Sequence, residues 1–320
     1  MPLLEVKGLR SYFYTRRGVV KAVDGVSFSV AEGGTLGLVG ESGCGKSITC
    51  LSILRLLPRP AGKIVGGQVL FNGKDLLALS EEEMRSYRGK HLSMILQDPM
   101  MSLNPVLTIG SQVGEGIAIH RRLTGKSLLQ STVKVLQQVR IPAAKSRLGA
   151  YPHQFSGGMR QRVVGAIAIS CEPHVLIADE PTTSLDVTIQ AQYLRLLKEI
   201  QQEFGLAIIF VTHDFGIVAK MCDQVAVMYA GKVVELADVR ELFEHPLHPY
   251  TKALLESVPA VDERITRLYS IEGQPPLLYN LPPGCRFAPR CAVAEARCHT
   301  DYPPEAEPGP GHRVSCWRVA

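Results

Sequence analysis

The sequence lacks long hydrophobic runs. None of the apolar stretches in its 320 residues approaches the roughly 18 residues that a membrane-spanning helix needs. The opening MPLLEVKGLR also lacks the long apolar segment of a secretory signal. We therefore expect a cytoplasmic chain that meets any membrane through a partner.

Dense blocks of basic charge are missing as well. The net charge is +5, but lysines and arginines are scattered among carboxylates, which is typical of a solvated surface rather than a nucleic-acid footprint. There is also no internal repeat and no coiled-coil insertion. The content of hydrophobic residues, 46%, provides core material for about two globular domains.

The eight cysteines fall into two groups. Four are dispersed and are expected to be small buried thiols. The other four crowd the C-terminal end with the spacing C-x5-C-x6-C-x17-C, unlike the paired C-x2-C knuckles of common zinc sites. In a reducing compartment such a group favours a metal site over a disulfide framework, and four soft thiolates suit either Zn²⁺ or an iron–sulfur cluster. These candidate ligands are Cys285, Cys291, Cys298 and Cys316.

The segment GESGCGKS at 40–47 carries the strongest signal, because it fits the pattern G-x-x-x-x-G-K-[ST]. An apolar run at 36–39 predicts a short buried strand before it, and 48–57 predicts a helix stopped by Pro58. The loop then opens onto a helix N-terminus, where backbone N–H groups can cradle phosphates, Lys46 can reach the outer phosphates and the Ser47 hydroxyl can bind Mg²⁺. The predicted phosphate-site residues are Gly40, Glu41, Ser42, Gly43, Cys44, Gly45, Lys46, Ser47 and Ile48.

Two further segments carry matching chemistry. An apolar strand at 175–178 ends at Asp179 and Glu180, and the carboxyl ends of strands are where open α/β sheets bind ligands. Asp179 is thereby placed to hold Mg²⁺ together with Ser47. The triplet Ser156, Gly157 and Gly158 opens another helix with a serine cap, which predicts a second anion site.

The order of the expected elements predicts two domains. A β-rich opening is followed by weak strand signals and an amphipathic helix at 127–139, then by strands at 175–178 and 207–211. A hairpin around Ala230 and Gly231 closes this part. Beyond it the chain is rich in proline and loops. We expect a nucleotide-binding domain at 1–240, with a helical subdomain at about 99–158, and a separate extension at 241–320 that a metal would staple.

The ordered set GESGCGKS, LQDP, FSGGMRQR, VLIADEP, SLD and VTHD resembles the ATP-binding-cassette (ABC) ATPases. The resemblance implies an α/β P-loop NTPase fold: a RecA-like core, an antiparallel β subdomain and a helical subdomain. It implies ATP and Mg²⁺ as cofactors, with Glu180 as the general base that polarises the attacking water. It further implies that His213 contacts the γ-phosphate and that Gln97 senses Mg²⁺ at the junction with the helical subdomain.

Two other roles follow from the same resemblance. Phe13 lies where the family stacks an aromatic ring on adenine, although packing within the sheet is the alternative for this side chain. The family uses the Ser156 to Gly158 motif in trans, on the ATP of a facing subunit, with Asp186 crossing the interface. Dimerisation is thus implied, with either a sister chain or a second copy.

The extension narrows the resemblance. The segment HPYT at 248–251, with QDPMMSLNP and the C-terminal cysteines, is similar to the ATPase subunits of bacterial dipeptide, oligopeptide and nickel permeases. This implies a peripheral ATPase at the cytoplasmic face of the inner membrane, beneath two transmembrane subunits fed by an extracytoplasmic binding protein. The resemblance further implies that this ATPase energises the import of di- or oligopeptides. Family members carry a [4Fe-4S] cluster, which favours iron over zinc at the four cysteines.

Three alternatives remain open at this point. The cargo of the same family can be nickel. A cassette acting on nucleic acid or the ribosome is disfavoured by the absence of basic arms and coiled coils. An exporter cassette is disfavoured by the extension.

Overall fold

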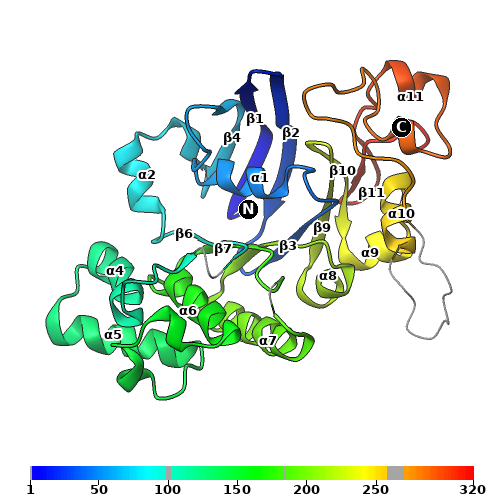
Figure 1. The fold of residues 1–320 in the computed structure, drawn as a ribbon. Helices are drawn as coiled ribbons and strands as arrows, with labels where there is room; N and C mark the ends of the chain where they lie inside the picture. The colour runs from blue at the N-terminus through cyan, green and yellow to red at the C-terminus, as the bar shows by residue number, and fades with distance from the viewer. Residues whose placement is uncertain (1, 99–101, 184, 258–269) are drawn as a thin grey trace. The chain divides into compact units, whose positions relative to one another are not determined.

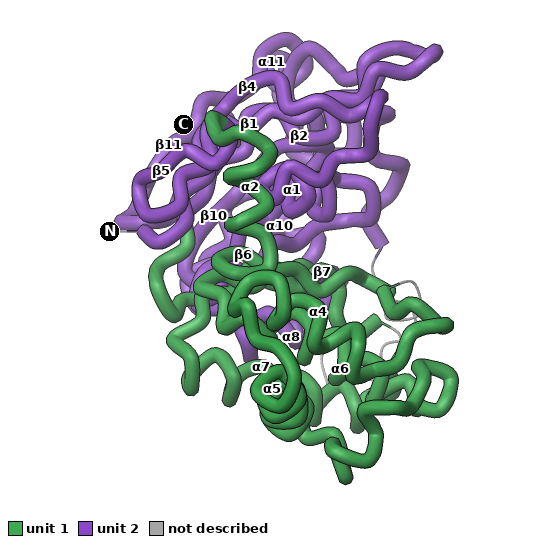
Figure 2. Tube along the Cα trace, turned by 90° about the vertical axis from the view of Figure 1, so that its left-hand side faces the viewer, with its two compact units in different colours: residues 1, 30–34, 78–211 green, residues 2–29, 35–77, 212–320 purple. Residues whose placement is uncertain are grey.

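The computed structural model describes residues 2–98, 102–183, 185–257 and 270–320 (Figure 1). Its chain forms two compact units (Figure 2). We call residues 30–34 and 78–211 the helical unit, and residues 2–29, 35–77 and 212–320 the two-sheet unit.

The first sheet of the two-sheet unit has the strand order β2-β1-β4-β5. Strand β1 pairs antiparallel with β4, and β4 pairs antiparallel with β5. Alternating buried and exposed positions along β1 show that one face of the sheet is packed and the other is wetter. The strands are β1 (Leu4–Thr15), β2 (Gly18–Val30), β4 (Gly62–Phe71) and β5 (Lys74–Asp75).

Strands of the second sheet in this unit follow the order β11-β12-β10-β9-β3. The pair β3 and β9 is parallel, whereas β9–β10, β10–β12 and β12–β11 are antiparallel. Two strands of the C-terminal extension therefore continue the predicted hairpin. The strands are β3 (Thr35–Val39), β9 (Gln224–Tyr229), β10 (Lys232–Asp238), β11 (Ala306–Gly309) and β12 (His312–Val314). The helices of the unit are α1 (Lys46–Ile53), α8 (Phe215–Met221), α9 (Val239–Glu244), α10 (Pro249–Glu256) and α11 (Ala296–Thr300).

A buried carboxylate anchors the extension to β10. Glu235 is fully buried, and it accepts hydrogen bonds from the backbone N–H of Leu247 (2.7 Å) and of His248 (3.0 Å). The Nε2 of His312 lies 2.8 Å from the same carboxylate. Burial lowers the pKa of His248 to about 3, so this imidazole is neutral, and its Nδ1 accepts from the N–H of Tyr250. The buried carboxylate is thus hydrogen-bonded by residues that follow the hairpin in the chain.

The helical unit contains three parallel strands in the order β8-β7-β6. Every residue of β7 and β8 is buried, as expected for a parallel sheet. The strands are β6 (Leu92–Ile95), β7 (Val175–Asp179) and β8 (Ala207–Val211). The helices are α2 (Glu81–Tyr87), α4 (Ile109–Arg121), α5 (Gly125–Gln138), α6 (Gly157–Ile169) and α7 (Val187–Phe204).

Helix α1 is shorter than the sequence predicts. It ends at Ile53, not at Leu57, because Arg55 adopts a left-handed conformation with φ 54°. The N–H of Leu56 then bonds to the carbonyl of Leu51 (2.8 Å) and that of Arg55 to the carbonyl of Ser52 (3.0 Å). This is a Schellman end with arginine in the place that glycine usually takes, so no local signal marked it.

The other predicted elements are confirmed where the structure describes them. They include the strand before the phosphate loop, the helix at 127–139, the strands at 175–178 and 207–211, and the hairpin around Ala230. Some predicted positions lie outside the described residues. These are 99–101 of the segment QDPMMSLNP and the start of the helical subdomain, Ser184 of SLD, and 258–269 of the extension.

Candidate functional site

The phosphate-binding loop, residues 40–47, connects β3 to α1 in the two-sheet unit. Its glycines at 40 and 45 have φ of 145° and 110°, which L side chains rarely adopt. A Cβ on Gly40 would lie 2.2 Å from the carbonyl oxygen of Met228, and one on Gly45 would lie 2.2 Å from that of Ala22. The loop is therefore pressed against two backbone segments, and only glycine fits at these two positions.

Lys46 is folded back onto its own loop. Lys46 is buried, with 6% of its surface exposed, and its Nζ donates to the carbonyls of Gly40 (2.7 Å) and Glu41 (3.1 Å). Phosphate oxygens offer an ammonium group stronger partners than neutral carbonyls do. Cys44 is buried behind the loop, and burial raises the pKa of its thiol, so it is a space-filling neutral group there. Ser47 and Ile48 are half-buried at the start of α1.

Phe13 lies half-buried on β1, opposite Gly62 of β4. Its two aromatic neighbours are engaged elsewhere: Tyr12 Oη donates to Asp24 Oδ1 at 2.6 Å, and the Tyr14 ring faces Lys63 Nζ at 5.4 Å from its centroid. Phe13 is thus the ring of this trio without such a polar partner.

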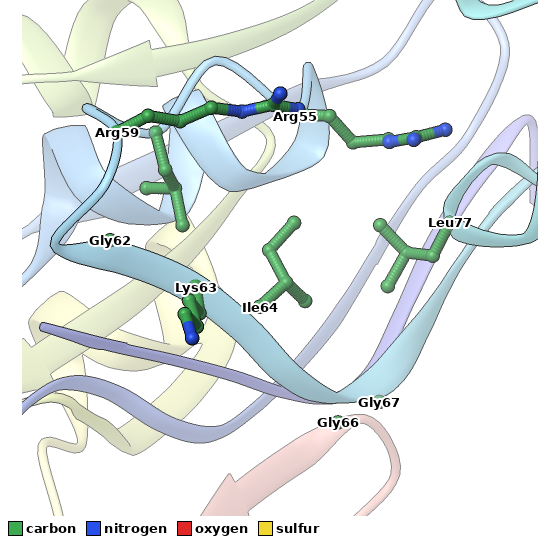
Figure 3. Close-up of a pocket in the computed structure, with 9 residues that line it drawn as sticks. Arg55, Arg59, Gly62, Lys63, Ile64, Gly66, Gly67 and Leu77 are labelled. Carbon is green, nitrogen blue, oxygen red and sulfur yellow. The ribbon is translucent and has the colours of Figure 1, made fainter. Parts of the chain in front are cut away.

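A cationic hollow of about 520 Å³ lies nearby on the same unit. Figure 3 shows Arg55 and Arg59 on one side of it and Lys63 and Ile64 on β4. It contains none of the residues predicted to bind nucleotide or Mg²⁺. Its chemistry is that of a basic surface hollow, distinct from the phosphate-binding loop.

In the helical unit, the structure brings Gln97, Glu180 and Thr183 together. Gln97 Nε2 donates to Glu180 Oε2 at 2.8 Å, and Thr183 Oγ1 donates to the same oxygen at 3.1 Å. Asp179, immediately before Glu180, ends β7 and is 4% exposed. The sequence reading missed Thr183, whose only signal was its position three residues after the carboxylate.

The backbone of Glu180 is strained. Its φ of 45° lies in the left-handed region, which costs a non-glycine residue about 1–3 kcal/mol. The strain is held by the bond from its N–H to the carbonyl of Val211 on the adjacent strand (3.0 Å). A carboxylate held in one orientation by strain and two donors is suited to act as a fixed base.

The second predicted anion site is also in the helical unit. Ser156 caps α6, with Oγ accepting from the N–H of Met159 (3.4 Å), and Asp186 caps α7, accepting from the N–H of Ile189 (3.0 Å). A Cβ on Gly158 would lie 2.7 Å from Ile189 Cγ2, so the starts of the two helices are in contact. Ser156, Gly157 and Asp186 are exposed.

His213 follows β8 and belongs to the two-sheet unit. The next residue, Asp214, caps α8 by accepting from the N–H of Gly216 (2.7 Å) and of Ile217 (3.2 Å). His213 is exposed at this turn. The structure places it at the carboxyl end of an apolar strand, as the sequence predicted.

The four C-terminal cysteines line one small cavity. Its free volume is about 20 Å³, room for a water molecule, and its other walls include Phe287, Val293 and Trp317. Burial raises the pKa of the thiols of Cys285, Cys291 and Cys316, so free thiols there are protonated at neutral pH. Among the described residues, no three His, Cys, Asp or Glu side chains are arranged to hold a metal ion. The four thiols thus share one cavity but are not spaced there as metal ligands.

Two protein-family models match this sequence. The model described as "ABC transporter" matches residues 23–183, and the model described as "Oligopeptide/dipeptide transporter, C-terminal region" matches residues 234–298. Among solved structures, the dimeric ATP-binding cassette MJ0796 bound to ADP and Pi has a TM-score of 0.66 at 24% identity, covering 74% of this chain and 99% of that one. The cassette cbiO1 of Clostridium perfringens has a TM-score of 0.63 at 28% identity, over 76% and 91% of the two chains. Fold and loop thus define an ABC ATPase, a P-loop NTPase that hydrolyses ATP.

Relatives match over almost the full length. The probable peptide ABC transporter ATP-binding protein y4tR of Sinorhizobium fredii is 51% identical over 99% of this chain and 95% of its own. The Bacillus subtilis proteins DppD (dipeptide transport) and AppD (oligopeptide transport) are each 50% identical, over 98% of this chain and 94% and 96% of theirs. The chain belongs to the ABC transporter ATP-binding family, in the branch that carries the oligopeptide/dipeptide transporter C-terminal region.

The close approach at the phosphate loop gives the first prediction. Gly45→Ala should lower the free energy of unfolding by about 1–3 kcal/mol and abolish ATP binding, because the methyl group meets the Ala22 carbonyl. Gly43→Ala is the matched control: φ is also positive there, but no atom lies within 4 Å of its Cβ, so the loss should be about 1 kcal/mol. Denaturant unfolding and ATP titration measure both. Equal losses for the two variants would contradict the packing argument.

The hydrogen-bonded carboxylate of Glu180 gives the second prediction. Glu180→Gln should keep ATP binding and slow hydrolysis at least about 100-fold, because an amide cannot accept the proton of the attacking water. Single-turnover phosphate release measures this. Glu199→Gln, which removes a carboxylate from an exposed ion pair with Arg140, should leave the rate unchanged. Hydrolysis at the wild-type rate in Glu180→Gln would rule Glu180 out as the base.

Proposed function

We propose that this chain is the ATP-hydrolysing subunit of a bacterial importer for di- or oligopeptides. The observation that carries the proposal is identity of about half of all positions with peptide-transport ATP-binding proteins, across both the cassette and the C-terminal region. The nickel alternative is not favoured, because these relatives are named for peptides. None of them is named for nucleic acid or the ribosome, which also weighs against that rival.

In the proposed cycle, the chain positions phosphates, metal and water. The loop amides and Lys46 would bind the phosphates, Phe13 would stack on the adenine, and Ser47 and Asp179 would hold Mg²⁺ with Gln97 as its sensor. Glu180 accepts the proton of the attacking water. The γ-phosphate is contacted by His213.

A facing cassette supplies the rest of each site in this proposal. The exposed helix start at Ser156 and Gly157 would close on the ATP of the facing subunit, with Asp186 at the interface. Closure on two ATP molecules and reopening after hydrolysis would turn phosphate chemistry into motion. The facing cassette would be a sister subunit or a second copy.

The proposed assembly places the chain at the cytoplasmic face of the inner membrane, beneath two transmembrane subunits and an extracytoplasmic binding protein. None of the described helices is long and apolar enough to cross a bilayer, so those partners would provide the translocation path. We assign residues 1–240, with a helical subdomain at about 99–158, to the ATPase domain, and 241–320 to the extension.

Uptake in cells tests the function. In a strain that lacks the gene, wild-type chain should restore uptake of labelled dipeptides or longer peptides, and Glu180→Gln at matched expression should not. Labelled Ni²⁺ is the third cargo, and Glu199→Gln is the control variant. The proposal would be contradicted if the wild-type chain restored nickel uptake without peptide uptake. It would also be contradicted if wild-type chain and Glu180→Gln gave the same uptake of every cargo.

We also propose that Cys285, Cys291, Cys298 and Cys316 hold a [4Fe-4S] cluster, with Zn²⁺ as the alternative. The support is that four thiols from distant positions line one mostly apolar cavity. The cavity of about 20 Å³ is the size of a water molecule, so the four thiols would have to move apart to hold a cluster. When bound, the cluster would supply a covalent staple for the loop-rich extension.

Metal content tests this second proposal. Protein purified without oxygen should be brown and contain about four iron and four sulfide per chain, and Cys298→Ser should lose most of both. Cys171→Ser, a thiol in the helical unit, is the control and should keep them. Stoichiometric zinc in a colourless protein would show that the site binds Zn²⁺ and not an iron–sulfur cluster. The absence of both metals would refute the site.

A further inference from the structure

An arginine of the extension is hydrogen-bonded to the phosphate-binding loop. Arg290 Nη1 and Nη2 donate to the two carboxylate oxygens of Glu41 at 2.6 and 3.0 Å, which is a bidentate ion pair. The Arg290 side chain is 4% exposed and that of Glu41 is 28% exposed. A paired, largely buried fork of this kind fixes both distance and orientation.

Every N–H of the Arg290 guanidinium has a partner. Besides Glu41, Nε donates to the carbonyl of Glu272 (3.0 Å), Nη2 to that of Ile271 (3.2 Å) and Nη1 to Tyr229 Oη (3.3 Å). Five donors are thus distributed over four partners. Residues of the extension and the last residue of β9 therefore fix the position of the guanidinium independently of its bonds to the loop.

A second residue of the extension holds the same loop position. Tyr250 Oη accepts from the backbone N–H of Glu41 at 2.9 Å, and Tyr250 is fully buried. Its ring centroid lies 4.6 Å from that of Tyr229 and 5.3 Å from that of Phe287. The hydroxyl that meets the loop is therefore carried by a packed aromatic cluster.

Glu41 is consequently held at all its polar groups. Its N–H is bound by Tyr250, its carboxylate by Arg290, and its carbonyl by Lys46 Nζ. Lys46 is the cation that the phosphate-binding pattern assigns to the outer phosphates. Fixing Glu41 thereby fixes the first turn of the loop and the resting place of that lysine.

We propose that Arg290 and Tyr250 are positioning residues for nucleotide binding: the C-terminal extension presets the phosphate-binding loop through Glu41. The proposal rests on the loop being the ATP site. Ordering the loop before ATP arrives lowers the conformational entropy that binding must remove. Because Arg290 immediately precedes Cys291, the cysteine cavity and the loop are linked by a single step along the chain.

The test is ATP–Mg²⁺ affinity of the purified full-length chain, measured by calorimetry, with thermal melts to check folding. Arg290→Ala should raise the Kd about ten-fold, a typical result of losing a charge-assisted hydrogen bond. Arg290→Lys keeps the charge but loses the two-pronged hydrogen bonding. Its Kd should lie between those of the wild type and Arg290→Ala. Tyr250→Phe removes only the hydroxyl and should raise the Kd a few-fold at an unchanged melting temperature.

Arg297→Ala is the matched control. Arg297 also lies beside a cysteine, Cys298, but it pairs with Glu295 and the carbonyl of Trp317 instead of the loop. Its removal should leave the Kd unchanged. If general damage to the extension were responsible, Arg297→Ala would weaken ATP binding as much as Arg290→Ala does, and the proposal would be overturned.

A double-mutant cycle separates positioning from bulk stability. Once Glu41→Gln has broken the ion pair, Arg290→Ala should add no more than about a two-fold change in Kd. Fully independent effects of the two changes would overturn the proposal. Arg290→Lys and Tyr250→Phe decide the question if Arg290→Ala does not fold.

One further variant keeps this proposal apart from the assigned function. Lys46→Ala should abolish ATP binding; if it binds as the wild type does, the loop is not the ATP site and both ideas fail. If Lys46→Ala loses binding while Arg290→Lys and Tyr250→Phe bind normally, the ATP site stands and the positioning role is wrong.

Discussion

The close approach of the phosphate-binding loop to two backbone carbonyls is the constraint on which the rest of this site depends. Gly40 and Gly45 lie where a single methyl group would collide with Met228 and Ala22. Within the loop held in this way, Lys46 Nζ donates to the carbonyls of Gly40 and Glu41. The glycine pattern is therefore a packing requirement before it is a recognition signal.

The two units solve a similar problem in different ways. In the two-sheet unit, orientation comes from close packing and from a bidentate ion pair that the extension provides. In the helical unit, it comes from backbone strain at Glu180, with Gln97 and Thr183 bonded to the same carboxylate oxygen. Both arrangements remove freedom from a polar group before any ligand arrives, which is how a site avoids reorganisation during reaction.

Local signals were enough for much of the fold. The buried strands, the amphipathic helix at 127–139 and the loop between β3 and α1 follow from apolar periodicity and glycine spacing. The end of α1 did not, because Arg55 takes a left-handed conformation that residue type does not announce. The Glu41–Arg290 pair spans 249 positions, so only the tertiary structure reveals it. Thr183 lies three residues from Glu180, but it stands in ordinary turn composition and carries no signal of its own. The four cysteines were correctly grouped, yet their pattern could not define how large a ligand the cavity admits.

The most direct test of the account is a structure of the Glu180→Gln chain with ATP and Mg²⁺. The account predicts that residues 40–45 keep their present backbone, while Lys46 Nζ leaves the carbonyls of Gly40 and Glu41 for the phosphate oxygens. The ion pair between Glu41 and Arg290 should persist. Nucleotide bound away from the loop, or a loop that refolds around the phosphates with that pair broken, would contradict the claim that the site is preset.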